Sequence, residues 1–253
     1  MIDGLTPEQV DANTKLLFDA AWTGDAKRVA QLLPLSDPLA RNENGYTALL
    51  EALRGSHDEI AQLLLPVSDP KMKCRGMTPL MFAAGSCGLG MVQSLLPGCD
   101  PFAQNDSGMT ALMFAAGNAR IDSARLLLQV SDPLARNSEG QTALMLAAEN
   151  DHPETIQLLL PVSDAFVQDS RGRTALMRAA WFGNPEAIDQ LLEASDCEAL
   201  NCRGESAAKI ARSRGHEAIA KKIESYAWAA AERTMLSEIA EPGARERSRA
   251  RSI

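Results

Sequence analysis

The sequence predicts an all-α solenoid in which helix–turn–helix units stack and are joined by hairpin-like loops. Two signatures recur in phase along its 253 residues. One is Gly-x-Thr or a close variant, whose glycine returns every 31 or 32 residues, as Gly45, Gly76, Gly108, Gly140, Gly172 and Gly204. The other is a Leu-Leu pair followed by a turn and an aspartate, as Asp37, Asp69, Asp100, Asp132, Asp164 and Asp196. Two signals at one fixed period indicate stacked supersecondary units.

One unit, from Thr142 to Gly172, illustrates the pattern. Thr142 can cap a helix over residues 143–148, because a threonine hydroxyl accepts a hydrogen bond from a free amide at the helix start. Pro153 opens a second helix, and Pro161 ends it because proline lacks an amide hydrogen. Gly172 is expected to take a positive φ that turns the chain into the next helix. Each unit is therefore helix, turn, helix and outstretched loop.

The two ends of the chain depart from the repeat. Thr6, Pro7 and Gln9 are typical of a helix start, so a short helix over residues 7–12 is expected to shield the first repeat. At the other end, the last helix continues without glycine or proline until Pro242, and it is alanine-rich and amphipathic. We interpret it as a long cap, since the ends of a solenoid must be covered. The alternative is a docking helix or a dimer contact.

The predicted organisation has four parts. Residues 1–13 form an N-terminal capping segment, and residues 206–240 form a capping repeat with an extended helix. Residues 241–253 are predicted to be a disordered, solvated tail, with contact to nucleic acid or an acidic membrane as the alternative. The basic residues of this tail are Arg245, Arg247, Arg249 and Arg251. Residues 14–205 form six repeats, with bounds at 14–46, 47–77, 78–109, 110–141, 142–173 and 174–205.

The residues of each unit resemble a known family. The pattern Gly-x-Thr-Ala/Pro-Leu-x-x-Ala-Ala, the Leu-Leu pair and the Asp that begins the hairpin are similar to those of ankyrin repeats, over residues 14–223. The run from Thr78 to Ala84 matches the helix start of that family most closely. The resemblance implies an ankyrin-repeat solenoid that recognises proteins through a concave side, made by the hairpin tips and the first helices.

The chain also departs from the family pattern in two ways. The histidine that usually follows Thr-Pro-Leu is replaced, so we expect apolar packing to hold the helix start. The replacing residues are Leu50, Met81, Met113, Met145 and Met177. A proline stands where a glycine normally follows the second helix, so we expect these helices to be stopped rather than glycine-capped. These prolines are Pro34, Pro66, Pro97 and Pro161.

Composition and charge exclude several classes of protein. No apolar run approaches the roughly 18 residues of a membrane span, and the N-terminus lacks the pattern of a cleavable secretion signal. The five cysteines are an odd number without a framework, which favours reduced thiols and a cytoplasmic location. Residues 1–206 carry 15 basic and 27 acidic side chains, a net of −12, whereas the rest carries +4. An acidic body disfavours nucleic-acid binding, except through the basic tail.

The sequence gives no sign of catalytic chemistry. His57, His152 and His216 fall at inter-helix turns of different repeats, so they are expected to stabilise turns rather than converge on a site. Cys197 and Cys202 lack the second pair that a zinc site needs. We therefore expect no catalytic, metal or cofactor site, and a protein that is not an enzyme.

The family resemblance places partner contacts at three sets of positions. Those after the loop glycines are Tyr46, Met77, Met109, Gln141 and Arg173. Those at the ends of the first helices are Trp22, Thr23, Arg54, Asn118, Asn150, Trp181 and Phe182. The hairpin tips add Arg41, Asn42, Lys71, Lys73, Arg136, Asp169 and Arg171.

Two tryptophans stand out within this surface. Trp22 and Trp181 hold the same repeat position near opposite ends of the stack. Tryptophan is enriched at binding hot spots, which favours a role in recognition. The alternative is that each tryptophan covers a thin, alanine-rich core near a stack end.

We therefore predict a monomeric, non-catalytic module that binds a partner protein of unknown identity. One alternative is a secreted effector or inhibitor that grips a foreign protein. Another is a regulator tethered to nucleic acid through the arginine tail, whose binding would weaken steeply with salt.

Overall fold

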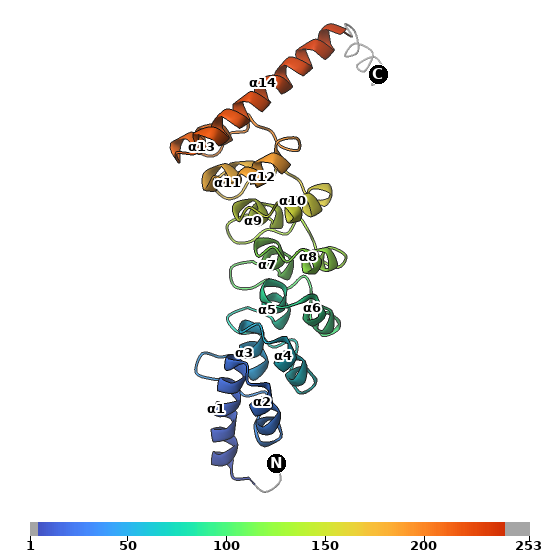
Figure 1. The fold of residues 1–253 in the computed structure, drawn as a ribbon, viewed down its shortest axis with the longest axis vertical. Coiled ribbons are helices and arrows are strands. Elements are labelled where there is room, and N and C mark those ends of the chain that lie inside the picture. The colour runs from blue at the N-terminus through green and yellow to red at the C-terminus, as the bar shows by residue number, and fades with distance from the viewer. Residues whose placement is uncertain (1–4, 241–253) are drawn as a thin grey trace.

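The computed structural model describes residues 5–240, which form one elongated stack of helices (Figure 1). The first helices of the units form one column, and the second helices form another column beside it. The first column contains α1 (Pro7–Thr23), α3 (Ala48–Arg54), α5 (Pro79–Ser86), α7 (Ala111–Gly117), α9 (Ala143–Glu149), α11 (Ala175–Phe182) and α13 (Ala207–Ser213). The second contains α2 (Ala26–Leu32), α4 (Asp58–Leu64), α6 (Leu89–Leu95), α8 (Ile121–Leu127), α10 (Pro153–Leu159), α12 (Pro185–Leu191) and α14 (Glu217–Ala240). The predicted all-α solenoid is confirmed.

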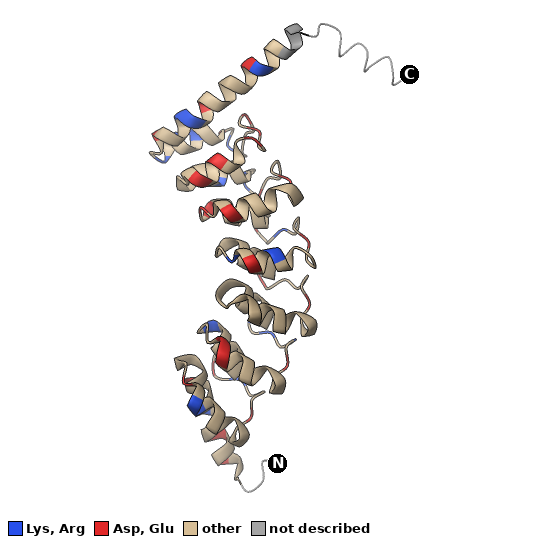
Figure 2. Ribbon diagram, turned by 45° about the vertical axis from the view of Figure 1, so that its right-hand side comes forward, with Lys and Arg blue, Asp and Glu red and all other residues tan. Residues whose placement is uncertain are grey.

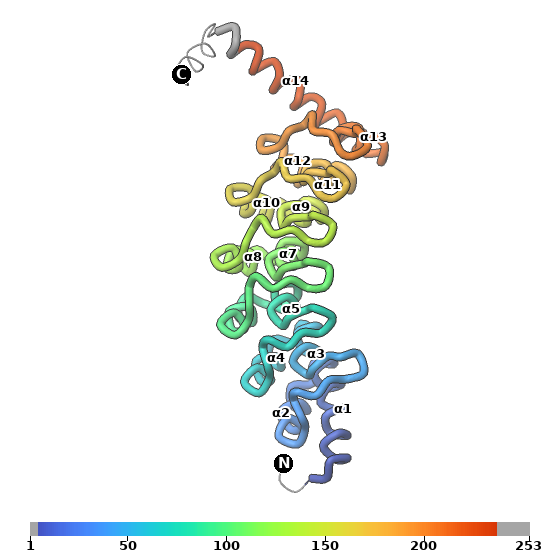
Figure 3. Tube along the Cα trace, turned by 180° about the vertical axis from the view of Figure 1, so that it is seen from behind, coloured from blue at the N-terminus to red at the C-terminus, as the bar shows by residue number. Residues whose placement is uncertain are grey.

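Hairpin loops project from the column of first helices, on the left in Figure 1 and on the right when the molecule is seen from behind in Figure 3. Each loop reverses at a glycine with positive φ, for example +73° at Gly172, as the sequence predicts. A side chain at this glycine would meet the neighbouring hairpin, since an added Cβ would lie 2.6 Å from the amide nitrogen of Cys202. Successive hairpins are also tied together, because the amide of Cys202 donates to the carbonyl of Arg171 at 3.1 Å.

The first helices begin with a threonine cap and an apolar third residue. The Thr78 hydroxyl accepts a hydrogen bond from the amide of Met81 at 3.3 Å, and Thr47, Thr110, Thr142 and Thr174 do the same in their repeats. The apolar side chains that follow these caps are all buried, namely Leu50, Met81, Met113, Met145 and Met177. The apolar packing expected at these helix starts is therefore present.

Four of the second helices end at a proline, and the chain there adopts a conformation that the sequence did not predict. The α-helical hydrogen bonds stop before each proline, but the chain continues for one 3-10 turn that contains it. These turns are η1 (Leu33–Leu35), η2 (Leu65–Val67), η3 (Leu96–Gly98) and η4 (Leu160–Val162). A 3-10 turn satisfies carbonyls at a helix end that would otherwise lack partners, so the proline redirects the helix end rather than leaving it open.

The prediction of a short N-terminal helix over residues 7–12 is wrong. Helix α1 begins at a capping box formed by Thr6 and Gln9 and continues without a break to Thr23. Thr14, placed at the start of the first repeat, lies inside this helix, where its hydroxyl donates to the carbonyl of Val10 at 2.7 Å. No glycine or proline separates the two parts, so the capping segment and the first repeat helix form one element.

The last helix, α14, extends beyond the stack (Figure 1). Ile219 and Ile223 are buried at its base, whereas Trp228, midway along the helix, is 77% exposed. Within residues 5–240, no helix is long and apolar enough to cross a membrane. The arginines of the predicted tail lie outside the described residues.

Candidate partner-binding face

The predicted partner contacts differ in how far they reach the surface. Trp22, Thr23, Arg54, Asn118, Asn150 and Phe182 are exposed. Tyr46, Met77, Met109 and Trp181 are half-buried. Gln141 and Arg173 are buried, as is Asp169, which was placed at a hairpin tip. These last three side chains therefore act within the protein instead of pointing toward solvent. We call the surface made by the hairpin loops and the exposed ends of the first helices the hairpin face.

An arginine–aromatic stack lies at the N-terminal end of the hairpin face. The Arg54 guanidinium carbon lies 4.5 Å from the ring centroid of Trp22 and 5.1 Å from that of Tyr46. Tyr46 in turn meets the edge of Phe82, with ring centroids 6.2 Å apart. The contacts join α1, α3 and α5, so one continuous aromatic surface spans three successive repeats.

Acidic and amide side chains hold Arg54 in this position. The buried Glu51 carboxylate accepts from Arg54 Nη1 at 3.1 Å through one oxygen and from Asn42 Nδ2 at 2.7 Å through the other. Arginine over an aromatic face is attracted by the ring quadrupole. Trp22 is nevertheless 45% exposed, so the stack is ordered while still presenting apolar area to solvent.

A second arginine–tryptophan stack lies at the C-terminal end of the same face. The Arg214 guanidinium carbon is 3.8 Å from the ring centroid of Trp181, and that of Arg173 is 5.9 Å from it. Phe182, the next residue, is 46% exposed. Both tryptophans that the sequence singled out therefore lie against arginines, Trp22 against Arg54 and Trp181 against Arg214 and Arg173.

Beneath the second stack lies a buried ion-pair network centred on Asp169. Its Oδ2 accepts from Arg173 Nη2 and from Arg178 Nη1, both at 2.9 Å. Arg178 also pairs with Glu149, and the side chains of Asp169 and Arg178 are only 1% and 4% exposed. The Gln141 amide lies against this guanidinium, 2.8 Å from Nη1 when its oxygen faces it. Charge burial of this kind is costly unless every group is paired, which explains the dense bonding.

Sequence reasoning missed this network, although a signal was present. Asp169, Arg173 and Arg178 each lie 32 residues after a neutral counterpart. These counterparts in the preceding repeat are Asn137, Gln141 and Leu146. Three changes from neutral to charged in one repeat, one acidic and two basic, indicate a contact among the three side chains rather than three independent surface positions.

The network fixes the charge state of Asp169. Burial alone would raise the pKa of this carboxyl group, but the amides of Arg173 and Arg171 and the Arg173 guanidinium outweigh it and hold the pKa below its ordinary value. Both amides donate to Oδ1, at 2.9 and 2.8 Å. Asp169 is therefore ionised in the folded protein under neutral and mildly acidic conditions.

This lowered pKa predicts how stability depends on pH. Because the folded pKa lies below the unfolded value of about 3.9, the unfolded chain binds more protons in acid, and the contribution of Asp169 is lost as pH falls through the folded pKa. The variant Asp169→Asn/Arg173→Gln/Arg178→Leu, which copies the preceding repeat, should lose stability less steeply below about pH 4. Urea unfolding of both proteins between neutral pH and acid measures this difference. Parallel pH profiles would show that Asp169 has no such role.

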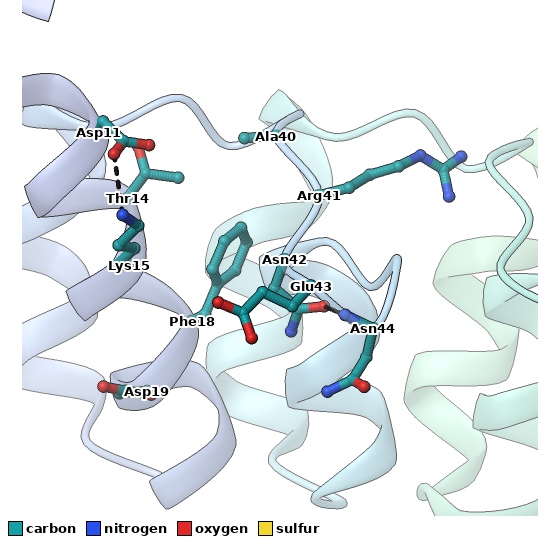
Figure 4. Close-up of a pocket in the computed structure, with 10 residues that line it drawn as sticks. All are labelled: Asp11, Thr14, Lys15, Phe18, Asp19, Ala40, Arg41, Asn42, Glu43 and Asn44. Carbon is teal, nitrogen blue, oxygen red and sulfur yellow. Dashed lines mark hydrogen bonds and ion pairs between the residues drawn. The ribbon is translucent and has the colours of Figure 1, made fainter. Parts of the chain in front are cut away.

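A cleft lies at the other end of the face, between α1 and the first hairpin (Figure 4). Its volume is about 320 Å³, and Phe18 lies at its centre among polar side chains. Asp11, Asp19 and Glu43 line it, and only Asp11 pairs with a lysine there, Lys15, at 3.0 Å. Arg41 also lines the cleft, so the three carboxylates and two cations give the N-terminal cleft a net charge of −1.

The histidines connect neighbouring repeats. The Nε2 atom of His57 lies 3.0 Å from the carbonyl oxygen of Trp22, and that of His152 lies 3.1 Å from that of Gly117. Both carbonyls belong to the first helix of the preceding repeat. Among residues 5–240, no three histidine, cysteine or acidic side chains gather as metal ligands.

Family models match the chain over most of its length. A model of three ankyrin repeats matches residues 17–101 and 86–165, and a model of a single ankyrin repeat matches residues 171–205. No curated protein was found to match the chain. Ankyrin repeats generally mediate protein–protein interaction and are typically not enzymes. The matched residues cover more than half of the chain, and they coincide with the stacked helix pairs and glycine-turned hairpins described above. The chain belongs to the ankyrin-repeat family.

Proposed function

We propose that the protein binds a partner protein on its hairpin face, the concave side of the solenoid, and performs no catalysis. The observation that carries this proposal is the pair of arginine–tryptophan stacks, one at each end of the face. Trp22 lies against Arg54, which Glu51 holds in place. Trp181 lies against Arg214 and Arg173, of which Arg173 is held by Asp169. Tryptophan and arginine are the residue types most enriched at binding hot spots, and both stacks combine them.

The middle of the face supports the same proposal. Helices α5, α6 and α7 carry no charged residue (Figure 2), so the charges of this stretch lie in its loops, for example on Lys73 and Asp106. Half-buried Phe114 and Leu146 contribute apolar surface there. Asn118 and Asn150 beside them each donate a hydrogen bond to a carbonyl of their own helix, at 2.8 and 2.9 Å. The surface is thus ordered before a partner arrives, which keeps the entropic cost of binding small.

We further propose that the protein acts as a monomer in the cytoplasm. The five cysteines are all free, which suits a reducing compartment. Burial raises the pKa of the Cys87 thiol to about 12 and that of Cys99 to about 11, so neither forms a reactive thiolate at neutral pH.

The proposal is tested by capturing the partner from a lysate of the source cell and measuring its affinity for two variants. Phe182→Ala removes an exposed side chain from the hairpin face, and Leu63→Ala removes one, 42% exposed, from α4 in the second column of helices. We expect Phe182→Ala to weaken binding by about tenfold, a loss of about 1.4 kcal/mol, and Leu63→Ala to leave it unchanged. Equal affinities, or a loss only with Leu63→Ala, would place the binding surface elsewhere.

A further inference from the structure

A second cleft lies beside Trp181, between the last two hairpins. Its volume is about 310 Å³, and it is lined by Arg171, Arg173, Trp181, Cys202, Arg203 and Glu205, among others. The amide of Cys202 donates to the carbonyl of Arg171, which joins the two hairpin tips that form the walls. The cleft is therefore built from rigidly connected elements, with an indole ring on one side.

The positive charges around this cleft exceed the negative ones. Among residues 5–240, Arg171, Arg203 and Arg214 make no ion pair. Arg173 is already neutralised by Asp169. Glu205 is the one acidic side chain among the residues that line the cleft, and Asn201 donates to it at 3.0 Å. Arg171 and Arg203, whose guanidinium groups make no ion pair, thus line a cleft whose lining holds one carboxylate.

The rest of the protein limits which anion can enter. The N-terminal cleft at the opposite end of the face carries a net charge of −1, from three carboxylates against two cations. Residues 1–206 as a whole carry a net charge of −12. A long polyanion such as a nucleic acid is repelled along most of this surface. A short acidic segment that reaches only the C-terminal cleft is not.

We propose that the C-terminal cleft binds an acidic segment of the partner protein, with a carboxylate between Arg171 and Arg203. Arginine suits this role because its planar guanidinium binds a carboxylate through two parallel hydrogen bonds. An apolar side chain next to the carboxylate would pack on the indole of Trp181. This inference rests on the proposed function and adds the chemistry of the ligand to it.

Cys202 provides a reporter for the test, because it lines the cleft and is exposed. The rate at which iodoacetamide alkylates Cys202 is measured by mass spectrometry, at constant ionic strength, with and without blocked tetraglutamate at millimolar concentration. We expect the peptide to slow alkylation about twofold when its concentration equals its dissociation constant. Blocked tetralysine should not slow it.

Two variants decide whether the arginines are responsible. Arg171→Gln/Arg203→Gln should abolish the protection, each rate being compared with that of the same variant without peptide. Arg75→Gln is the matched control, because Arg75 is also exposed and also precedes a loop glycine, Gly76, and it should retain full protection. The proposal is overturned if tetraglutamate gives no protection, or protects the double variant equally.

Two further outcomes separate this inference from the proposed function. Protection by tetrathymidylate equal to that by tetraglutamate would mean that the cleft binds nucleic-acid phosphates and would overturn the acidic-segment assignment. If tetraglutamate does not protect Cys202 while Phe182→Ala still weakens binding of the captured partner, the proposal of an acidic ligand is wrong and the proposed hairpin-face binding is supported. If tetraglutamate protects Cys202 while Phe182→Ala leaves the partner's affinity unchanged, the proposed ligand of the cleft is supported and binding on the wider hairpin face is not.

Discussion

Replacing Asp169 with alanine is expected to lower the free energy of unfolding by about 3–5 kcal/mol, because two buried arginines lose their shared partner. Oδ2 of Asp169 accepts from Arg173 and Arg178, and Oδ1 accepts from the amides of Arg171 and Arg173. Alanine leaves all of these donors without that acceptor in a place that water hardly reaches. Urea denaturation followed by circular dichroism measures the loss.

The chain supplies its own control for this experiment. The variant Asp169→Asn/Arg173→Gln/Arg178→Leu reproduces the side chains that the preceding repeat carries at the same positions. Replacing a buried charged cluster by neutral groups is often neutral or stabilising. Glu149 loses Arg178 in this variant, but its side chain is 22% exposed and stays partly solvated, so the variant should recover most of the stability. The account of the network is contradicted if Asp169→Ala costs less than about 1 kcal/mol, the range of an exposed ion pair. It is also contradicted if the triple variant is as unstable as Asp169→Ala.

Replacing Trp22 with alanine is expected to weaken partner binding by about 30-fold, a loss of about 2 kcal/mol, as for a hot-spot residue. The indole is 45% exposed and is held by Arg54, so it presents an ordered apolar surface. Arg54→Ala should also weaken binding, because Trp22 and Tyr46 lose the guanidinium that lies against both rings. Titration calorimetry with the captured partner gives each affinity.

Trp228→Ala is the matched control for Trp22→Ala. Trp228 is more exposed, at 77%, but it lies midway along α14, outside the hairpin loops and first-helix ends that form the hairpin face. Exposure alone would make Trp228 the more important residue, whereas the hairpin-face account predicts unchanged affinity. A larger loss with Trp228→Ala would transfer the binding site to α14, the docking-helix alternative for this segment.

Much of the fold follows from the sequence because it depends on local chemistry. The threonine caps, the positive-φ glycines and the ends of the second helices at proline each depend on a few neighbouring residues. The continuity of α1 was missed because the predicted boundary followed the repeat period instead of the local helix signals. The capping box at Thr6, with no breaker before Gly24, already indicated a single helix.

The site was predicted less completely, because its features depend on contacts between repeats. Position in the repeat correctly singled out exposed residues such as Trp22 and Phe182, which remain predicted contacts. It failed for Arg173 and Gln141, whose side chains turn inward, Arg173 toward Asp169 of its own hairpin and Gln141 toward Arg178 of the next repeat. The C-terminal cleft likewise forms between two hairpins 32 residues apart, so no local pattern marks it.

Hydroxyl-radical footprinting with the captured partner tests the central claim most directly, because aromatic and methionine side chains on different surfaces report separately. On the hairpin face the reporters are Trp22, Tyr46 and Phe182. Away from it the reporters are Trp228 and Met235 on α14, both of them exposed. The account predicts that the partner slows oxidation of the first set and leaves the second unchanged. Protection of the second set, with Trp22 and Phe182 still oxidised at their free rates, would contradict binding on the hairpin face.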